Sequence, residues 1–207
     1  MQFLMLSIMD LIRLLDFTFS LIGLILLAPL LLVLACIIKL SSKGPVFYMQ
    51  SRVGKNGEDF RLFKFRSMCT DADRNGYITV GGKDKRITAA GYYLRKYKLD
   101  ELPQLINVLK GEMSIVGPRP ELRRYVDLYN VEQRRVLDVL PGITDYASIA
   151  YRNENEVLGA AANPEEMYVR EIMPKKIELN FSYINNRNLK EYFTIIWQTI
   201  TSAVIGR

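Results

Sequence analysis

Residues 17–38 read FTFSLIGLILLAPLLLVLACII, a run of 22 residues in which no side chain is charged. About 20 apolar residues suffice to cross the hydrocarbon core of a bilayer, so this run predicts a membrane-embedded helix. A cleaved secretory signal is the weaker interpretation, because the run is longer than the apolar core of such signals. The run is followed by Lys39, Lys43, Arg52 and Lys55, which predicts that the rest of the chain faces the cytoplasm.

Pro29 lies near the middle of this run. Proline lacks a backbone N–H, and its ring clashes with the carbonyl four residues earlier, here that of Ile25, so we expect the helix to bend. A bent helix can cross the bilayer or return to the side from which it entered, and the physics of the segment leaves both alternatives open. The chain is therefore divided into a membrane segment, residues 1–40, and a cytosolic, interface-associated domain, residues 41–207.

The composition of the 207 residues excludes several kinds of chemistry. Histidine is absent, which excludes Ser-His-Asp and Cys-His catalysis and any His-ligated metal. Cys36 and Cys69 form no CxxC pair, so neither a disulfide framework nor a thiolate metal site is expected. Residues 41–120 hold 15 basic and 8 acidic side chains, an excess that favours anionic lipid or phosphate ligands. No nucleic-acid-binding motif accompanies this excess, and nucleic acid is not an expected partner.

The rest of the chain is typical of an α/β domain that is mostly helical with a short β-hairpin. Residues 46–48 and 60–65 are largely apolar and aromatic and flank the turn sequence Gly54-Lys55-Asn56-Gly57, which predicts the hairpin. Residues 66–83 are predicted to form a loop. A helix lying in the membrane interface is favoured over a buried core helix for the last twenty residues, which include Tyr192, Phe193, Ile195, Ile196, Trp197 and Ile200. Helices are predicted over residues 87–99, 102–110, 121–140 and 188–207.

The densest group of reactive side chains runs from Arg95 to Gln104 and contains Asp100 and Glu101 beside basic residues. On spacing alone, the two acids could cap the helix that begins near Pro103, which is a common arrangement. Adjacent carboxylates beside basic side chains can also hold a divalent cation together with a diphosphate. A carboxylate can itself attack phosphorus and form an acyl phosphate without histidine or cysteine.

Short motifs along nearly the whole chain carry a resemblance to a known family. After the apolar segment with its central proline, they are Gly44-Pro45-Val46-Phe47-Tyr48, Gln50-Ser51-Arg52-Val53-Gly54, Phe63-Lys64-Phe65-Arg66-Ser67-Met68, Leu99-Asp100-Glu101-Leu102-Pro103-Gln104-Leu105, Asn107-Val108-Leu109-Lys110-Gly111-Glu112-Met113-Ser114, Val116-Gly117-Pro118-Arg119-Pro120-Glu121 and Pro141-Gly142-Ile143-Thr144. In this order the chain resembles the small monotopic phosphoglycosyl transferases of the bacterial sugar transferase family, which begin glycan assembly on polyprenyl phosphate.

The resemblance implies transfer of a sugar 1-phosphate from a UDP-sugar to undecaprenyl phosphate, with release of UMP, Mg²⁺ as cofactor and a covalent phosphosugar–enzyme intermediate. It implies Asp100 as the nucleophile and Glu101 as its partner, which would assist in binding Mg²⁺ or activate the lipid phosphate. Arginine suits phosphate binding because its planar, permanently charged fork matches phosphate oxygens. The residues that match the family's motifs as substrate-binding positions are Lys64, Arg66, Arg95, Pro118, Arg119, Pro120 and Arg152.

The resemblance also implies where the protein works. A helix-break-helix over residues 1–40, bent at Pro29, would dip into the membrane lipid from the cytoplasmic face of the bacterial inner membrane and return. The enzyme would perform the first membrane step in the biosynthesis of a glycoconjugate such as exopolysaccharide or lipopolysaccharide. Downstream glycosyltransferases and a second copy of the chain are further partners that this interpretation allows.

Two departures from the family pattern bear on these expectations. Ala28 stands where members often carry a serine that can bond a freed carbonyl, so other groups would hold the bend. Asp145-Tyr146-Ala147-Ser148 replaces a Gly-Trp-Ala-Gln run that is common after Gly-Ile-Thr. The identity of the transferred sugar is therefore not predicted.

Two alternatives assign a different task to the acids. In a direct displacement, the lipid phosphate attacks the UDP-sugar, and Asp100 and Glu101 only bind metal. In a membrane scaffold, the basic stretch grips anionic headgroups and the acids only cap a helix. A covalent enzyme exchanges labelled UMP into UDP-sugar without acceptor, a direct displacement does not, and a scaffold responds to neither Mg²⁺ nor UDP-sugar.

Overall fold

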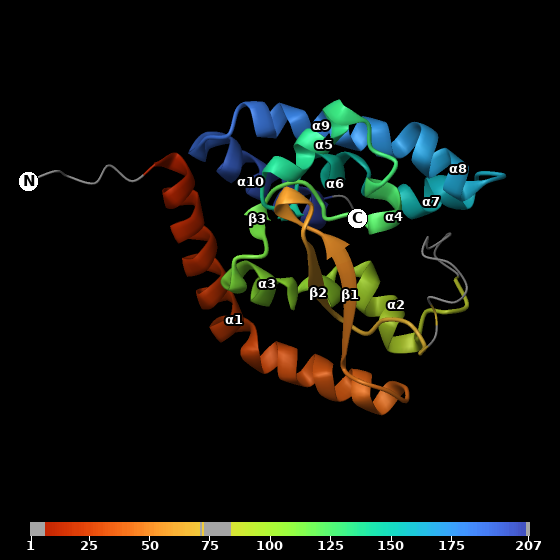
Figure 1. Cartoon of the computed structure of the whole chain (residues 1–207). Helices are drawn as coiled ribbons and strands as arrows, with labels where there is room; N and C mark the ends of the chain where they lie inside the picture. Colours follow the sequence, from red (N-terminus) through yellow and green to blue (C-terminus); the bar gives the residue numbers. More distant parts are fainter. Residues whose placement is uncertain (1–6, 71, 73–83, 206–207) are drawn as a thin grey trace, which may run out of the picture.

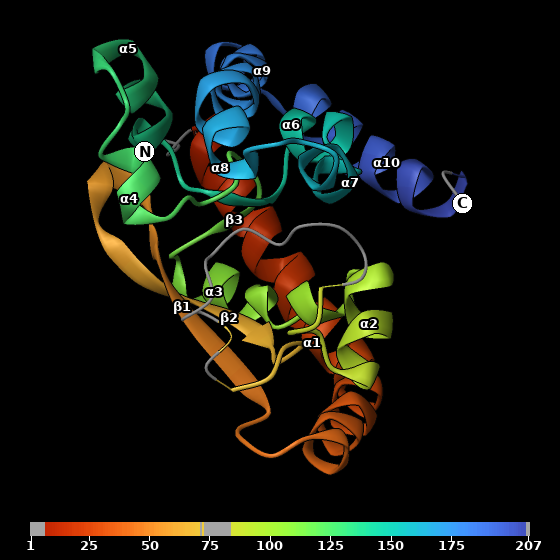
Figure 2. The ribbon, with the colours of Figure 1, turned by 90° about the vertical axis from the view of Figure 1, so that its right-hand side faces the viewer.

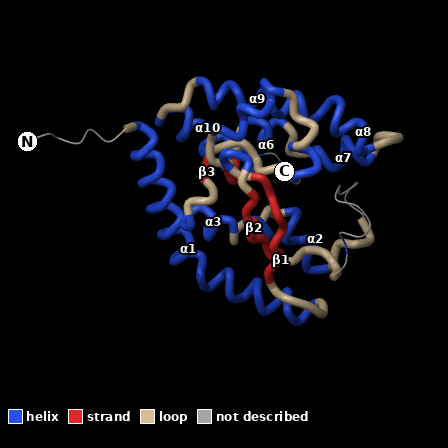
Figure 3. Tube along the Cα trace, in the orientation of Figure 1, coloured by secondary structure: helices blue, strands red, loops and turns tan. Residues whose placement is uncertain are grey.

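The computed structural model describes residues 7–70, 72 and 84–205 of the chain (Figure 1). Most of them are helical, and two small sheets of two strands each lie near the centre (Figure 3). This confirms the predicted fold, mostly helical with a short β-hairpin. The α-helices are α1 (Ile8–Ser41), α2 (Ala89–Lys96), α3 (Gln104–Lys110), α4 (Arg123–Val126), α5 (Val131–Arg134), α6 (Tyr146–Ala150), α7 (Glu154–Gly159), α8 (Pro164–Met167), α9 (Met173–Asn185) and α10 (Leu189–Ile205). The strands are β1 (Phe47–Val53), β2 (Asp59–Phe65), β3 (Ser114–Val116) and β4 (Gly142–Thr144).

The elements form two groups that face each other. One group consists of α1, α2, α3 and the β1–β2 hairpin, and the other of α4 to α10, as Figures 1 and 2 show from two directions. Short 3-10 turns, η1 (Lys55–Gly57), η3 (Leu99–Glu101) and η4 (Arg135–Asp138), and a π-helical turn, η5 (Tyr168–Ile172), complete the regular structure described.

Helix α1 begins at a capping box, in which the Ser7 hydroxyl accepts from the Asp10 N–H and the Asp10 carboxylate accepts from the Ser7 N–H. Pro29 lies inside this helix, and Figure 1 shows that α1 is bent in its middle part, as predicted. The helix continues through the bend, so the predicted helix-break-helix is one bent helix. By length and composition α1 could cross a membrane, and 11% of its most apolar 18-residue stretch is buried.

The first part of α1 is tied to the rest of the protein by two charged side chains. Arg13 Nη1 donates to the carbonyl of Val108 at 2.7 Å, and its Nη2 donates to that of Leu109 at 3.3 Å, so Arg13 supplies donors to two carbonyls at the end of α3. Asp16 Oδ1 accepts from the Ile115 N–H at 2.9 Å and from the Tyr192 hydroxyl at 2.8 Å. These bonds connect α1 to α3, β3 and α10.

The last part of α1 is tied to the same body of the protein. Arg66 follows β2, and its Nη2 donates to the carbonyl of Ser42 at 2.7 Å and to that of Ile38 at 3.3 Å. Ile38 also packs with Phe65 and Leu94 in a small buried cluster. Burial of each such side chain stabilises the fold by about 1.5–3 kcal/mol. Both ends of the apolar run therefore contact one folded domain.

The predicted hairpin is confirmed. β1 and β2 pair antiparallel from Phe47 opposite Phe65 to Val53 opposite Asp59. Helix α3 is fixed on this hairpin by the buried Asn107, whose Oδ1 accepts from the Phe63 N–H at 3.0 Å. The segment just before α3 is thereby held in place as well.

The predicted helices over residues 87–99 and 102–110 are confirmed with shorter bounds, as α2 and α3. Most of the predicted loop over residues 66–83 lies outside the described residues. The single helix predicted over residues 121–140 is wrong, because that stretch forms α4, α5 and η4. Asn130 starts a new helix with a capping box to Gln133, and this local bonding competes with a continuous helix.

The second sheet was not predicted from the sequence. β3 and β4 pair in parallel, with Ser114 opposite Gly142 and Val116 opposite Thr144. A Cβ atom at Gly142 would lie 2.6 Å from the Gly117 Cα and closer still to its backbone N and O, so this contact requires glycine. The close approach fixes the start of the loop that contains Arg119.

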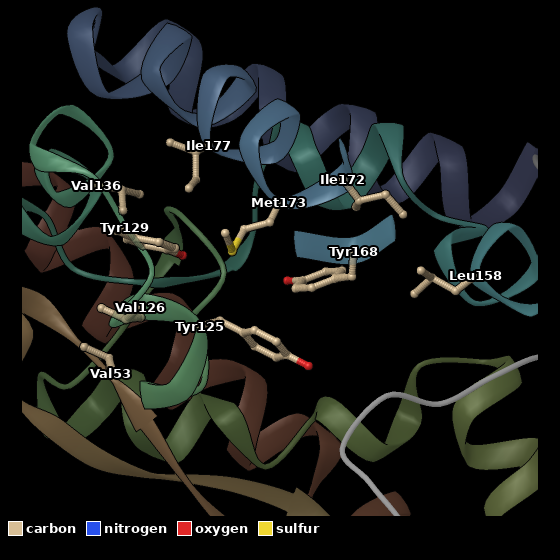
Figure 4. Packing of buried hydrophobic residues seen from close by; sticks show 10 residues of the cluster. All are labelled: Val53, Tyr125, Val126, Tyr129, Val136, Leu158, Tyr168, Ile172, Met173 and Ile177. Carbon is tan, nitrogen blue, oxygen red and sulfur yellow. The ribbon is translucent and has the colours of Figure 1, made fainter. Parts of the chain in front are cut away.

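The larger hydrophobic core lies beneath α9, and Figure 4 shows its side chains. It is formed by Val53, Tyr125, Val126, Tyr129, Val136, Leu158, Tyr168, Ile172, Met173 and Ile177. Val53 at the end of β1 joins this core, and its N–H donates to the carbonyl of Glu121 at 2.9 Å. The hairpin therefore connects the two groups of helices, in addition to the bond between Asp16 of α1 and Tyr192 of α10.

Helix α10 confirms the helix predicted over residues 188–207 and combines both patterns proposed for it. Tyr192 and Ile195 are fully buried, whereas Phe193, Ile200 and Trp197 are exposed, the last to 67%. Phe193 meets Phe19 of α1 edge to face, with ring centroids 6.4 Å apart. The exposed side of α10 thus adjoins the apolar surface of α1.

Candidate active site

Asp100 and Glu101 form the 3-10 turn η3 between α2 and α3. The turn begins at Lys98, a non-glycine residue with φ of 57° in the left-handed region. Neither acid caps α3, because that helix starts after Pro103 and receives no capping bond from a side chain. The helix-capping interpretation of the two acids is therefore wrong, and their burial needs another explanation.

Glu101 is held by two cations. Lys64 Nζ donates to Glu101 Oε1 at 3.0 Å, and Arg119 Nη1 donates to Oε2 at 3.2 Å while its Nη2 bonds Oε1. Burial alone would raise the pKa of Glu101, but Arg119 and Lys64 hold that pKa well below its usual range. Glu101 is thus held in its ionised form, with both carboxylate oxygens engaged.

Asp100 has the opposite environment. It is 6% exposed, and no side chain among the described residues forms a hydrogen bond or ion pair with its carboxylate. Burial and the negative charge of Glu101 raise the pKa of Asp100, and the nearby charges of Lys64, Arg95 and Lys98 oppose this shift. Its surroundings therefore disfavour the ionised carboxylate.

A cavity of about 1430 Å³ opens in front of the two acids and is lined by both groups of helices. It is larger than the roughly 300–1,000 Å³ of ordinary small-molecule sites, which suits two substrates that are bound in turn. The predicted site residues that line it are Lys64, Arg66, Arg95, Asp100, Glu101, Arg119 and Arg152. The structure therefore brings together seven residues that the sequence analysis selected from five separate segments.

These basic residues differ in what they contact. Lys64 and Arg119 bind Glu101, whereas Arg66 bonds the end of α1 through Nη2, and its buried Nε and Nη1 have no hydrogen-bond partner among the described residues. Arg152 is exposed and bonds the carbonyl of Ser202 in α10. Arg95 lies on α2, near enough to Asp100 to lower its pKa.

Pro118 and Pro120 do not line the large cavity. Both are buried on either side of Arg119, where the Pro118 carbonyl accepts from the Gly142 N–H at 2.9 Å. The Pro120 carbonyl accepts from Arg52 Nη1 at 3.1 Å. Their position is that of a rigid frame for Arg119, and Pro29 lies in α1, away from the residues that line the cavity.

Two residues of the site were not selected from the sequence. Arg52 is half-buried in β1 and lines the cavity, and its place two residues after Gln50 on one strand face was the available signal. Asp145 is 1% exposed, and its Oδ2 accepts from the Arg119 N–H at 2.7 Å. Nothing in the linear sequence predicts that contact, which spans two strands of the unpredicted sheet.

Among the described residues there is no group of three or more acidic or cysteine side chains that could hold a metal ion. Magnesium, however, is commonly bound by one or two carboxylates together with substrate phosphates. Asp100 is the carboxylate with free oxygens, whereas both oxygens of Glu101 are engaged by Lys64 and Arg119. The residues fit a magnesium ion that arrives with a diphosphate.

Residues 8–206 match the sequence model of a protein family described as Bacterial sugar transferase. The chain is 39% identical over 196 residues to the UDP-N-acetylgalactosamine-undecaprenyl-phosphate N-acetylgalactosaminephosphotransferase of Aeromonas hydrophila, which covers 92% of this chain and 43% of that protein. It is 38% identical over 199 residues to the UDP-glucose:undecaprenyl-phosphate glucose-1-phosphate transferase of Klebsiella pneumoniae, with 94% and 40% covered. It is 31% identical over 207 residues to the exopolysaccharide production protein ExoY of Sinorhizobium fredii, with 93% and 84% covered. The chain thus spans less than half the length of the first two relatives.

Proposed function

Because the chain belongs to the bacterial sugar transferase family, we propose that it transfers a sugar 1-phosphate from a UDP-sugar to undecaprenyl phosphate and releases UMP. Two of the relatives described above are named for such transfers to undecaprenyl phosphate. The observation that carries the proposal is the Asp100 carboxylate, which is nearly buried, lacks a bonding partner among the described residues, and faces a large cavity with basic walls.

In the proposed reaction, an Asp100 oxygen attacks the sugar-bearing phosphorus of the donor. The bond between that phosphorus and the bridging oxygen breaks, and UMP leaves with the electron pair. The sugar 1-phosphate is then held on Asp100 as an acyl phosphate. An oxygen of undecaprenyl phosphate attacks the same phosphorus, and the bond to Asp100 breaks and restores the carboxylate.

The environment of the two acids supports this division of work. A nucleophile gains from being desolvated and unpaired, and Asp100 has both properties. Glu101 holds Lys64 and Arg119 at the wall of the cavity, where their remaining N–H groups can bind phosphate oxygens. We therefore assign Glu101 to the positioning of cations rather than to direct attack.

In this proposal, magnesium would arrive bound to the diphosphate of the substrate. Asp100 is the residue that would share the ion with the diphosphate, and the ion would neutralise charge that develops on the departing UMP. In this proposal the chain's own residues supply the nucleophile and the cations that bind phosphate.

The test is exchange of labelled UMP into UDP-sugar in the absence of acceptor, with the full chain in lipid nanodiscs. We expect exchange in the wild type and none in Asp100→Asn, and mass spectrometry should find a phosphosugar adduct on the peptide that contains Asp100. Asp59→Asn is the matched control, because Asp59 forms an exposed ion pair with Arg123 outside the cavity. Exchange that persists in Asp100→Asn would exclude the covalent step, and UMP release without any exchange would favour direct displacement.

The placement in the membrane is part of the proposal. A straight helix over residues 17–38 would extend about 33 Å and separate its ends by a bilayer. Asp16 and Ile38, which flank or end this run, instead contact the same domain through Ile115 and Arg66. This arrangement supports a re-entrant α1 that enters and leaves on one face, which we propose is the cytoplasmic face of the inner membrane.

The topology can be tested with single cysteines in a background that carries Cys36→Ser and Cys69→Ser. Met9→Cys and Leu40→Cys mark the two ends of α1, and Val131→Cys marks the main domain; all three native side chains are exposed. In sealed vesicles, a membrane-impermeant maleimide should label all three from the same side. Labelling of Met9→Cys from the side opposite to Val131→Cys would show that the helix crosses.

The proposed reaction places the protein at the start of a biosynthetic sequence. Its product is a lipid-linked sugar diphosphate, and the class of reaction that consumes such a product is glycosyl transfer onto the sugar. Enzymes of that class are the partners expected downstream. The exposed apolar side of α10 beside α1 is the surface that we expect to lie in membrane lipid.

A further inference from the structure

A second polar group lines the cavity next to the acids. We call it the polar lobe and define it as Gln50, Arg52, Glu121, Tyr125 and Tyr168, all of which line the cavity. Arg52 Nε and Nη2 donate to Gln50 Oε1 at 3.0 and 2.7 Å, and the Tyr168 hydroxyl donates to Glu121 Oε1 at 2.5 Å. Arg52 Nη1 lies 4.0 Å from Glu121 Oε2. The lobe is an organised network rather than a set of solvated surface charges.

The polar lobe is joined directly to the candidate active site by the chain. Arg119, Pro120 and Glu121 are consecutive: Arg119 reaches Glu101, the Pro120 carbonyl accepts from Arg52, and Glu121 accepts from Tyr168. A ligand whose phosphate lies at Arg119 therefore extends naturally toward Glu121. None of the interactions proposed for phosphoryl transfer uses the lobe.

The Tyr125 hydroxyl is the unexplained feature of this lobe. Tyr125 is 4% exposed, and its buried hydroxyl has no hydrogen-bond partner among the described residues. Leaving a buried polar group unsatisfied costs about 1–3 kcal/mol. Figure 4 shows that the hydroxyl points away from the core side chains around it, and Tyr125 lines the cavity. The missing partner is thus expected from the cavity side.

A second observation comes from the backbone of the neighbouring tyrosine. Tyr168 opens the π-helical turn Tyr168–Ile172 between α8 and α9. Such turns are rare and occur frequently at functional sites. Here the turn carries the Tyr168 ring to 5.0 Å from that of Tyr125, with its hydroxyl on Glu121.

The chemistry of the lobe limits what it can bind. A phosphate would be repelled by the Glu121 carboxylate, and an isoprenoid chain would leave the hydroxyl, amide and carboxylate groups without partners. Hydroxyl groups on adjacent ring carbons can donate to Glu121 and bond the Tyr125 hydroxyl. The Gln50 amide nitrogen adds donors, because it forms no hydrogen bond with the described residues.

We propose that the polar lobe binds the vicinal hydroxyl groups of a ring of the nucleotide-sugar donor, with Tyr125 and Glu121 as the specificity-determining residues. This inference rests on the proposed function for the presence of such a donor. The hydroxyl groups have two sources, the ribose of the UMP half and the transferred sugar, and the experiment below distinguishes them.

The experiment compares Tyr125→Phe with Tyr129→Phe in the full chain in lipid nanodiscs. Tyr129 belongs to the same buried core but does not line the large cavity, so it controls for the loss of a core hydroxyl. Dissociation constants are measured for UMP, UDP-N-acetylglucosamine and UDP-N-acetylgalactosamine. Loss of one neutral hydrogen bond should weaken binding about three- to tenfold in Tyr125→Phe and leave Tyr129→Phe unchanged.

The pattern across the ligands identifies the ring. Equal weakening for UMP and both UDP-sugars assigns the lobe to ribose, whereas weakening confined to UDP-sugars assigns it to the transferred sugar. We also expect Tyr125→Phe without ligand to unfold at the same or a higher temperature than the wild type, because an unsatisfied buried hydroxyl has been removed.

Two results would overturn the inference. One is unchanged affinity of Tyr125→Phe for all three ligands that the wild type binds, and the other is equal weakening in Tyr129→Phe, which would indicate a packing effect. A wild-type protein that binds UDP-sugars and releases no UMP with undecaprenyl phosphate would instead contradict the proposed transfer. The two failures are therefore distinguishable.

Discussion

Asp16 in α1 and Asp100 in η3 are two buried carboxylates in different regions of the molecule, with exposed fractions of 1% and 6%. Asp16 Oδ1 accepts from the Ile115 N–H and from the Tyr192 hydroxyl, whereas Asp100 accepts no side-chain bond from the described residues. The two carboxylates are thus nearly equally buried, but they differ in the number of hydrogen bonds that they accept.

The difference teaches how to separate a structural acid from a reactive one. A buried carboxylate that receives donors holds elements together, and Asp16 connects α1 to β3 and α10. A buried carboxylate without donors costs free energy of folding, and that cost is retained where the group serves a reaction. The predictions below test this contrast, from the largest effect to the smallest.

Exchanging the two carboxylates for amides should separate function from stability. We expect Asp100→Asn to lower the rate of UMP release by at least about 10³-fold, because the proposed nucleophile is lost. Asp16→Asn should retain UMP release within about tenfold, since the hydrogen-bond partners of Asp16, Ile115 and Tyr192, do not line the cavity in front of Asp100 and Glu101. The measurement is UMP release with undecaprenyl phosphate. A comparable loss in both variants would contradict the different roles assigned to Asp16 and Asp100.

Removing the carboxylate of Asp16 should destabilise the fold. Asp16→Ala removes the acceptor of the Ile115 N–H and of the Tyr192 hydroxyl and leaves two buried donors unsatisfied. We expect the free energy of unfolding to fall by about 2–4 kcal/mol. Thermal unfolding in nanodiscs measures this change, with Tyr192→Phe as a smaller perturbation of the same network. Unaltered unfolding of Asp16→Ala would show that the network carries no stability.

Breaking the ion pairs of Glu101 with Lys64 and Arg119 should lower both the stability of the fold and the rate of UMP release. Glu101→Gln leaves the partly buried cations Lys64 and Arg119 without their anion, so we expect a loss of about 2–3 kcal/mol in stability and a large loss of UMP release. In the wild type, Glu101 has a lowered pKa, and its stabilising contribution is present above pH of about 4.5 and is lost as the pH falls toward the lowered value. The difference between Glu101→Gln and the wild type should shrink in acid.

Asp100→Asn should stabilise the protein, in contrast to Asp16→Ala. The pKa of Asp100 is raised, so in the wild type stability is lost as the pH rises from about 4, where the unfolded chain ionises first. The gain in Asp100→Asn, about 1 kcal/mol, should therefore be present near pH 7 and absent near pH 3. Unfolding curves at the two pH values test this; a loss of stability at pH 7 would contradict the contrast.

The acid limb of the pH–rate profile should show the smallest effect. Attack requires the ionised Asp100, and burial and Glu101 raise its pKa, so UMP release should fall at a pH above the ordinary aspartate value of about 4. If UMP release falls only at or below a pH of about 4, the neighbouring cations lower the pKa of Asp100 by more than burial raises it.

Much of the site was predictable because its residues lie in short, recognisable segments. Lys64, Asp100, Glu101 and Arg119 were selected from the sequence, and the structure places all four around one cavity. The capping interpretation of the acids failed, because the backbone turns at Lys98 and α3 starts only after Pro103. Arg52 and Asp145 were not selected as site residues, because their bonds to Pro120 and Arg119 join segments that are distant in sequence.

The sequence by itself determined the bent apolar helix, the hairpin, the acids at positions 100 and 101 and the basic character of the segment around them, because these follow from periodicity, proline chemistry and local motifs. Only the tertiary structure decided that Glu101 is neutralised by Lys64 and Arg119 while Asp100 stays open, and that both ends of α1 meet one domain. These properties depend on contacts between residues far apart in the chain, where desolvation and hydrogen-bond supply are set by packing rather than by neighbours in sequence.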